Sequence, residues 1–72
     1  MAETTALTVI VNGEPHRAAV PLTLLELLEQ LGEPIDKAVI EHNGRYVRRP
    51  ELDGVDLSDG DRVEVILPAF GG

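Results

Sequence analysis

The segment TLLELLEQLG, residues 23–32, is the clearest helix pattern in the chain, and it limits the folds open to the rest of the sequence. Thr23 is a good N-cap residue and Glu26 stands three positions later, as in a capping box. Leucines recur with the spacing of one helical face, at positions 24, 27, 28 and 31. Gly32 suits a left-handed C-cap, and Pro34 prevents the helix from resuming. One amphipathic helix has to bury its leucine face against another layer.

Segments rich in β-branched residues lie on both sides of this helix and predict strands. They read LTVIVN, HRAAV, AVIEHNG, YVRRP and RVEVIL, beginning at residues 7, 16, 38, 46 and 62. Asn12-Gly13 and Asn43-Gly44 are strong signals for hairpin turns. Residues 51–61, ELDGVDLSDGD, are rich in turn formers and acidic residues.

The order strand, strand, helix, strand, short strand, strand predicts an α+β fold of the β-grasp type. A mixed sheet of four to five strands would pack on one helix, with the first and last strands side by side in its middle. A ferredoxin-like α+β arrangement needs a second helix, for which residues 51–61 contain too much Gly and Asp. We expect residues 1–67 to form the β-grasp domain and residues 68–72 to form a flexible C-terminal tail that ends in Gly-Gly.

Alternation along the first and last strands separates a core face from a face without a helix. The predicted core positions of these strands are Leu7, Val9, Val11, Val63, Val65 and Leu67. Ile10 and Ile66 fall on the other face, where polar residues are their neighbours. Exposed apolar patches often mark partner sites, so Ile10 and Ile66 are predicted to form one partner-binding patch. The alternative is that single exposed apolar side chains carry no function.

Charge and residue content argue against several classes of protein. The formal net charge of −7 opposes binding to nucleic acid or to anionic membranes. The basic cluster RYVRR is interpreted as a solvated hairpin, although a phosphate contact is the alternative. The chain contains no cysteine, which excludes disulfides and an iron–sulfur cluster, and His16 and His42 lack neighbouring ligands for a metal. The N-terminal residues show no signal-peptide pattern and no apolar run has membrane-spanning length, so we expect a cytoplasmic protein.

Candidate catalytic residues are few. Ser58 is the hydroxyl residue of the folded part beyond the helix cap, and no histidine stands near it in sequence. Asp59 and Asp61 flank a turn glycine, and although paired carboxylates perform acid–base chemistry or bind calcium, Asp-Gly favours a tight turn here. The sequence has no glycine-rich phosphate loop with a lysine. We therefore expect that the chain is not an enzyme by itself.

The C-terminal sequence LPAFGG is the most suggestive functional feature. Pro68 cannot donate to a strand ladder, and the five residues that it begins reach about 16 Å when extended. Gly71 and Gly72 give a backbone without side chains, which can pass through a narrow channel to a reactive centre. Phe70 makes the tail less polar than a flexible terminus without a function usually is, and suggests that the tail docks on a partner. The reactive group would then be the carboxylate of Gly72, activated by ATP bound to another protein.

A β-grasp chain with this terminus resembles the ubiquitin-like sulfur carriers of the ThiS/MoaD family, and most closely the ThiS-like members. The resemblance rests on VNGEP, TLLELLEQLG, EHNGRYVRR, LSDGDRVEVI and the terminal FGG, in that order, and covers essentially the whole chain. Two departures leave the pathway open. Two arginines stand where ThiS-like chains commonly show Pro-Arg. The proline of LPAFGG makes the C-terminal sequence similar to that of the molybdopterin sulfur carriers.

The resemblance implies a set of partners and a reaction. A ubiquitin-activating-type adenylyltransferase would adenylylate the Gly72 carboxylate, and a sulfur donor would convert it to a thiocarboxylate beside Gly71. Thiazole synthase, or the large subunit of molybdopterin synthase, would then receive the sulfur. Phe70, Ile10 and Ile66 would be docking contacts, unless Phe70 folds back on the domain. The chain itself would bind no cofactor, since ATP and the sulfur donor belong to the partner enzyme.

Other functions also remain open at this stage. A protein modifier that forms isopeptide bonds with lysines uses the same Gly-Gly terminus. A passive interaction module needs only the β-grasp fold. An RNA-binding accessory domain is disfavoured by the negative charge and by the scarcity of aromatic residues for base stacking.

Overall fold

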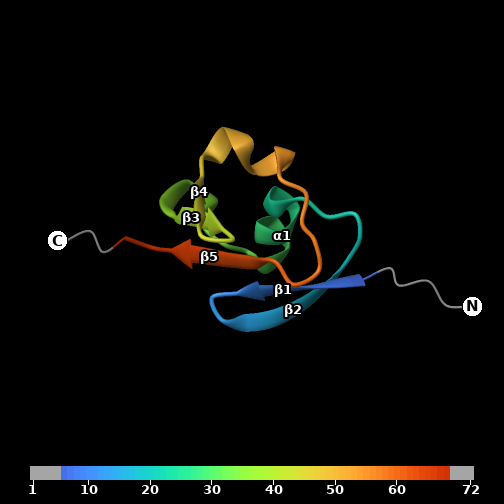
Figure 1. The fold of residues 1–72 in the computed structure, drawn as a ribbon. Helices are drawn as coiled ribbons and strands as arrows, with labels where there is room; N and C mark the ends of the chain where they lie inside the picture. Colours follow the sequence, from blue (N-terminus) through green and yellow to red (C-terminus); the bar gives the residue numbers. More distant parts are fainter. Residues whose placement is uncertain (1–5, 69–72) are drawn as a thin grey trace, which may run out of the picture.

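In the part of the chain that the structure describes, a five-stranded mixed sheet curves around a single α-helix (Figure 1). This architecture comes from a computed structural model, which describes residues 6–68 of the chain. The elements in chain order are β1 (Ala6–Val11), β2 (Glu14–Ala19), α1 (Leu24–Leu31), the 3-10 helix η1 (Ile35–Lys37), β3 (Val39–His42), β4 (Arg45–Val47), the 3-10 helix η2 (Arg49–Gly54) and β5 (Arg62–Ile66).

The strands lie in the order β2-β1-β5-β3-β4, so the last strand occupies the centre of the sheet. β1 and β5 run parallel, while β1 with β2, β3 with β4 and β3 with β5 are antiparallel. The parallel pair requires a long crossover, which α1 provides. The prediction of a β-grasp fold, with the first and last strands adjacent in the middle, is therefore confirmed.

Both ends of α1 follow the sequence signals. The Thr23 hydroxyl oxygen accepts a hydrogen bond from the Glu26 N–H at 3.1 Å, and a Glu26 carboxylate oxygen accepts one from the Thr23 N–H at 2.9 Å. Gly32 adopts φ 71°, the left-handed conformation that ends the helix without a steric penalty. The capping box and the C-cap are thus confirmed.

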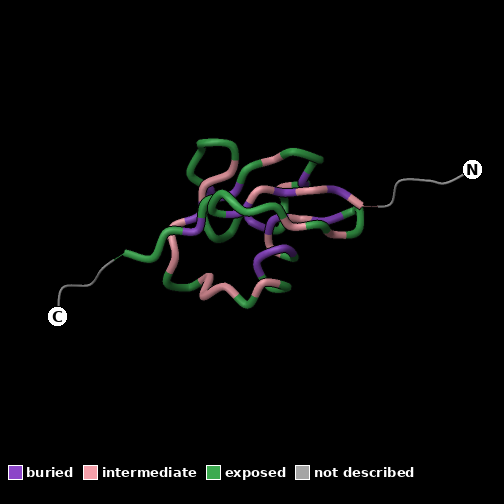
Figure 2. The backbone as a smooth tube through the Cα atoms, turned by 90° about the horizontal axis from the view of Figure 1, so that it is seen from below, coloured by how far each residue is buried: buried purple, intermediate pink, exposed green. Residues whose placement is uncertain are grey.

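The core lies between the inner face of the sheet and α1, where the buried positions gather in Figure 2. It contains the alternate residues of β1 and β5 and three of the four leucines of the predicted helix face, while the fourth, Leu31, packs against it partly exposed. Leu67 is the exception among the predicted core residues, because 57% of it is exposed. The last residue pair of β3 and β5 is Val39 with Ile66, so Leu67 lies beyond the sheet and no neighbouring strand covers it. Its assignment to the core was wrong.

The acidic segment before β5 is more ordered than its turn-rich sequence indicates. Its first part belongs to η2, which contacts α1 and buries Leu52 almost completely. A 3-10 helix of this length tolerates the Pro and Gly residues that exclude a long α-helix. η2 thereby covers a side of α1 that the sheet does not reach.

Both Asn-Gly turns hold the central strand by side-chain hydrogen bonds. Asn12 and Asn43 have φ values of 49° and 50°, as a two-residue hairpin turn requires. The Asn12 Oδ1 accepts the Val65 N–H at 2.8 Å, and the Asn43 Oδ1 accepts the Arg62 N–H at 2.8 Å. The hairpin turns were predicted, but these long-range bonds were not, because no local pattern reports them.

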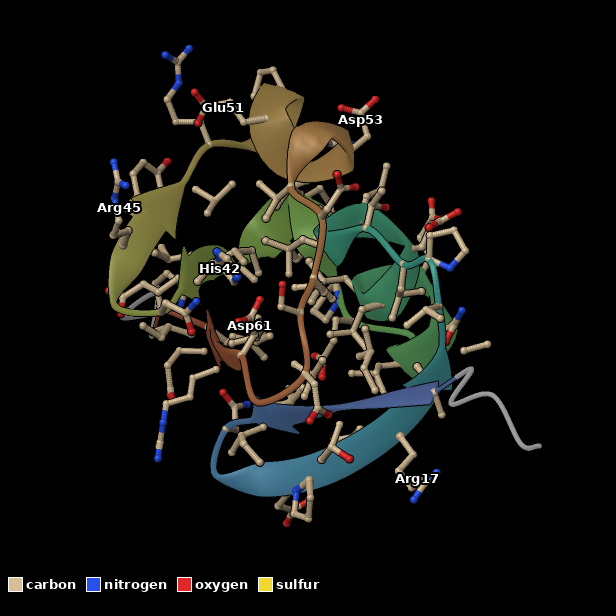
Figure 3. All side chains as sticks on the ribbon, turned by 45° about the vertical axis from the view of Figure 1, so that its right-hand side comes forward. Arg17, His42, Arg45, Glu51, Asp53 and Asp61 are labelled. Atoms are coloured by element: carbon tan, nitrogen blue, oxygen red, sulfur yellow. The ribbon has the colours of Figure 1, made fainter. Side chains whose placement is uncertain are left out.

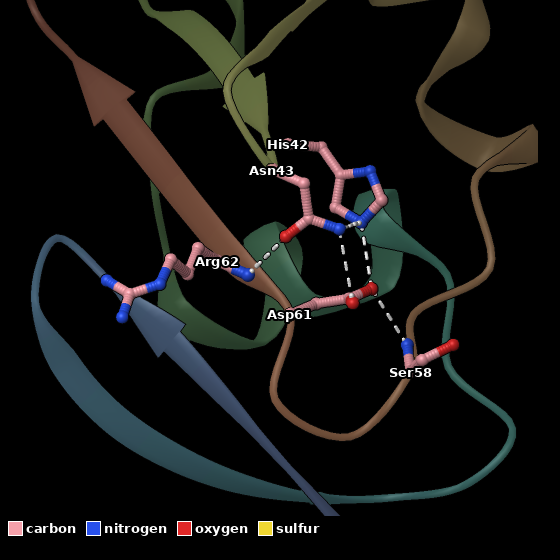
Figure 4. A network of polar contacts seen from close by, with 5 residues as sticks. All are labelled: His42, Asn43, Ser58, Asp61 and Arg62. Atoms are coloured by element: carbon pink, nitrogen blue, oxygen red, sulfur yellow. Dashed lines mark hydrogen bonds and ion pairs between the residues drawn. The ribbon is translucent and has the colours of Figure 1, made fainter.

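Asp61 links the loop before β5 to the β3–β4 turn (Figure 4). Its Oδ2 lies 2.8 Å from His42 Nε2 and accepts the Ser58 N–H at 2.9 Å. Its Oδ1 accepts the Asn43 side-chain amide at 3.2 Å. One carboxylate therefore fixes the entry into β5 to two separate segments.

The protonation of Asp61 is coupled to folding. Partial burial by itself raises the pKa of the carboxyl group, but the hydrogen bonds from His42, the Ser58 N–H and Asn43 together outweigh that effect and hold its pKa below the ordinary value of 3.8. A pKa that is lower in the folded than in the unfolded chain stabilises the fold above the unfolded value. This contribution is lost as the pH falls through the folded-state pKa.

We therefore expect Asp61→Asn to lower the free energy of unfolding by roughly 1–2 kcal/mol near neutral pH, since hydrogen bonds to a charged group are lost. The difference from the wild type should shrink as the pH falls below the ordinary value of 3.8 and through the lower folded-state pKa, because the wild-type carboxylate is then protonated as well. Urea unfolding followed by circular dichroism at a series of pH values measures this difference. Asp53→Asn, on the exposed surface of η2, is the matched control and should show no such loss. A stability difference that stays constant with pH would contradict the assigned role.

Candidate functional site

The C-terminal tail follows directly after β5, the central strand of the sheet. β5 ends at Ile66, and Leu67 and Pro68 are the last residues that the structure describes. Phe70, Gly71 and Gly72, the predicted docking and reactive residues, lie outside the described residues. What the structure does define is the point from which they start.

That starting point is held firmly in the middle of the sheet. β3 pairs with β5 along its length, and the carbonyls of Asp61 and Val63 accept the N–H groups of Ile10 and Asn12 at 2.8 and 2.9 Å. The Asn12 side chain adds its bond to Val65 on the same side. A terminus attached here leaves the domain from a fixed position, which suits a reactive group that must be presented to another protein.

Ile10 and Ile66 share the helix-free face, as predicted, but they do not form one patch. The register of β1 and β5 places Ile10 beside Arg62. Ile66 stands four positions further along β5, about 13 Å away at the usual rise of a strand. The prediction of a single patch was wrong, because strand alternation gives the face of a residue but not its register.

A different set of residues surrounds the start of the tail. Val39 lies directly opposite Ile66, Glu41 lies opposite Glu64, and Tyr46 of β4 lies opposite Glu41. We call these five residues the exit surface. Ile66 and Tyr46 are 43% and 64% exposed, so the exit surface combines accessible apolar groups with carboxylates.

The two carboxylates of the exit surface are an unusual pair. Like charges directly across a strand pair are destabilising. His42–Asp61 is the only ion pair in the part of the chain that the structure describes, so neither Glu41 nor Glu64 has a cationic partner there. The exit surface therefore favours a basic partner surface. The sequence alone does not reveal this pair of carboxylates, because the β3–β5 register is needed to place Glu41 opposite Glu64.

A hollow of about 450 Å³ opens on another side, between the β3–β4 hairpin and η2 (Figure 3). His42 and Arg45 line it together with Glu51 and Asp53, so both signs of charge face the same space. The arginines at positions 45, 48 and 49 are all exposed, as expected of a solvated hairpin. This mixture does not make a site selective for phosphate.

The carboxylates just before β5 accept hydrogen bonds from backbone N–H groups of the protein itself. Asp59 accepts the Thr8 N–H at 2.7 Å, and Asp61 accepts the Ser58 N–H. The interpretation of this segment as a turn is confirmed. Among residues 6–68, no three His, Asp or Glu side chains are placed to hold a metal ion, and His16 and His42 lie on different strands.

Membrane insertion through a helix finds no support in residues 6–68, where no helix has the length and the apolar character needed to cross a bilayer.

Comparison with known proteins agrees with this architecture. Residues 9–72 match the model of the ThiS family. The crystal structure of the thiamine biosynthesis protein (ThiS) from Geobacter metallireducens superimposes with a TM-score of 0.80 and 32% sequence identity, covering 92% of this chain and 100% of that one.

Two longer curated proteins also match. Thiazole synthase of Magnetococcus marinus is 39% identical over 61 residues, which is 85% of this chain and 19% of that protein. Thiazole synthase of Paramagnetospirillum magneticum is 29% identical over 92% of this chain and 20% of that protein. This chain thus spans about a fifth of the length of these relatives. The family match over most of its length, together with the β-grasp fold and the Gly-Gly terminus, shows that the chain belongs to the ThiS family.

Proposed function

We propose that the protein carries sulfur for the thiazole ring of thiamine as a thiocarboxylate on Gly72. The observation that carries this proposal is the match to the ThiS family, which extends to the last residue of a chain that ends in Gly-Gly. The position of β5 supports it, because the terminus continues from the central strand of the sheet, which is paired with β1 and β3.

The chemistry at Gly72 requires two displacements. An oxygen of the Gly72 carboxylate attacks the α-phosphorus of ATP held by an adenylyltransferase of the ubiquitin-activating type, and pyrophosphate leaves. A sulfide then attacks the acyl carbon, AMP leaves with the bridging oxygen, and the thiocarboxylate remains. Gly71 contributes by having no side chain, so that the terminus can enter a narrow active site. The acyl group belongs to this chain and the catalytic groups belong to the partner.

Thiazole synthase is the proposed acceptor of the sulfur. Two relatives that carry this name contain, within about a fifth of their length, a segment similar to 85% and 92% of this chain. The presence of such a segment in proteins named thiazole synthase supports an association between this chain and that enzyme. A separate small chain has to meet its acceptor by docking.

We further propose that the exit surface, together with Phe70, makes the docking contact with the adenylyltransferase. Ile66 is the anchor, since it is exposed, apolar and adjacent to the start of the tail. Ile10 contacts the partner on the same face at a second point, some distance away. The pair formed by Glu41 and Glu64 selects a partner surface with lysine or arginine.

The first test removes Gly72. Deletion moves the terminal carboxylate by about 3.5 Å, and displacement of a reacting group by an ångström costs on the order of a hundredfold in rate. We expect at least that loss in the rate at which the chain gains sulfur when it is incubated with the adenylyltransferase, ATP and sulfide. Intact-mass spectrometry reports the exchange of one oxygen for sulfur.

A chain with one alanine added after Gly72 is the matched variant, and it should fail in the same way because Gly72 no longer ends the chain. Both variants should unfold at the wild-type temperature, since neither change touches the core. The carrier proposal would be overturned by a truncated chain that gains sulfur as fast as the wild type. A wild-type chain that forms isopeptide bonds with lysines and never gains sulfur would support the protein-modifier alternative instead.

The second test concerns the exit surface. We expect Ile66→Asp to weaken binding to the adenylyltransferase by about tenfold or more, because an apolar anchor that the complex would bury is replaced by a charge. Ile10→Asp should weaken it less, since Ile10 lies further from the tail. Ala19→Asp, an exposed position of the same face on β2, is the control and should leave affinity unchanged.

Isothermal titration calorimetry gives these affinities, and thermal unfolding shows whether each variant is folded. Equal affinity of the folded Ile66→Asp variant and the wild type would remove the exit surface from the docking interface.

A further inference from the structure

Within residues 6–68, the later part of β5 has a neighbouring strand on one side only. β1 pairs with β5 at Ile10–Arg62 and at Val11–Val63, and the chain then turns away toward β2. β3 continues on the opposite side as far as the pair of Val39 and Ile66. Figure 1 shows the consequence, with the arrowhead of β5 extending past the turn between β1 and β2.

The backbone groups that face this open edge follow from the hydrogen bonds. The carbonyls of Asp61 and Val63 point toward β1, where they accept the N–H groups of Ile10 and Asn12. The two-residue period of a strand points the backbone of Val65 and Leu67 in the same direction. The Val65 N–H reaches the Asn12 side chain at 2.8 Å. The Val65 carbonyl and the Leu67 N–H come next, and no hydrogen bond within residues 6–68 reaches either of them.

Pro68 does not block this edge. It stands one residue after Leu67, so its nitrogen belongs to the β3 side, where the sheet has already ended. The outer edge of β2 differs in this respect, because Pro15 lies opposite Ile10 in a position whose nitrogen points away from β1. A proline in the outward phase discourages a strand from adding there. The edge at Val65 and Leu67 lacks that protection.

Side chains on both faces of the open edge are suited to contact with another chain. Ile66 is 43% exposed, and Leu67, which strand alternation places on the opposite side from Ile66, is 57% exposed. A strand laid along this edge would gain backbone hydrogen bonds and apolar contacts on both of its faces. Glu64 stands at the beginning of the edge, where a lysine or arginine of the incoming strand would face it.

We propose that the edge formed by Val65 and Leu67 pairs with an extended strand of the adenylyltransferase that activates Gly72. The proposal rests on the carrier function and adds the partner's mode of binding. Only five residues, about 16 Å of extended chain, separate Leu67 from the terminal carboxylate. An enzyme that surrounds Gly72 therefore lies beside this edge. Backbone pairing at Leu67 fixes the register of the tail, and a slip by one residue would move the carboxylate by about 3.5 Å.

Proline substitution separates the backbone contact from the side-chain contact. Leu67→Pro removes the N–H together with the side chain, while Leu67→Ala removes only the side chain. The Leu67 N–H lies outside the sheet ladder and Ile66 is already extended, so both variants should fold. Arg17→Pro is the matched control, because the Arg17 N–H points outward from the other edge of the same sheet.

We expect Leu67→Pro to bind the adenylyltransferase about tenfold more weakly than Leu67→Ala, which corresponds to the net loss of a backbone hydrogen bond or two. Arg17→Pro should bind as the wild type does. Amide hydrogen exchange of the wild-type chain, measured with and without the enzyme, should show slowing at Leu67 and none at Arg17. Equal binding by the two Leu67 variants, or exchange at Leu67 that the enzyme does not slow, overturns the proposal.

The outcomes distinguish the edge from the carrier chemistry. Slowed exchange at Leu67 in a wild-type chain that never gains sulfur would support the strand pairing and overturn the carrier function. Sulfur transfer without slowed exchange at Leu67 would support the carrier function and overturn the strand pairing. Slowed exchange in the absence of enzyme, with a mass in analytical ultracentrifugation that rises with concentration, would show that a second copy of this chain occupies the edge and would overturn the proposed partner.

Discussion

The parallel contact between β1 and β5 is the interaction on which the rest of the structure depends. It joins the two ends of the folded chain, and parallel neighbours cannot be linked by a short turn. The chain between them has to cross over the sheet, and α1 makes that crossing with its leucine face against β1 and β5. The capping box at Thr23 and the left-handed Gly32 determine where the crossing begins and ends. Once β5 is placed beside β1, the terminus necessarily leaves from the middle of the molecule.

Local signals were sufficient for most of the fold. Helix caps, hairpin turns and strand alternation each depend on residues within a few positions of one another, so the sequence predicts them well. Register is a different kind of information. It was the pairing of Ile10 with Arg62 that separated Ile10 from Ile66, and the end of pairing at Val39 that left Leu67 exposed. Neither of these two pairings can be predicted from the sequence of a single strand. The bonds from Asn12 and Asn43 to β5 escaped prediction for the same reason.

Hydrogen bonds from polar side chains supplement the short strand ladders of this sheet. A domain of 72 residues without cysteine has a small core and no covalent crosslink. Asn12 and Asn43 each serve twice, because the same residue forms the hairpin turn and accepts a backbone N–H of β5. Asp61 adds a third connection at the entry of the strand. All three act on β5 or its entry, so the strand that leads to Gly72 is held on the sides of both β1 and β3.

Support for β5 along its two edges contrasts with repulsion on its outer face. Glu41 and Glu64 stand opposite each other without a cation within residues 6–68, an arrangement that costs folding stability. A lysine or arginine placed between the two carboxylates would turn that repulsion into attraction. Binding strength and folding stability are thus in opposition at this point, and replacement of either glutamate by a neutral residue would strengthen the fold while weakening a complex with a basic partner. The fold tolerates this pair because the hydrogen bonds from Asn12, Asn43 and Asp61 hold β5 independently of it.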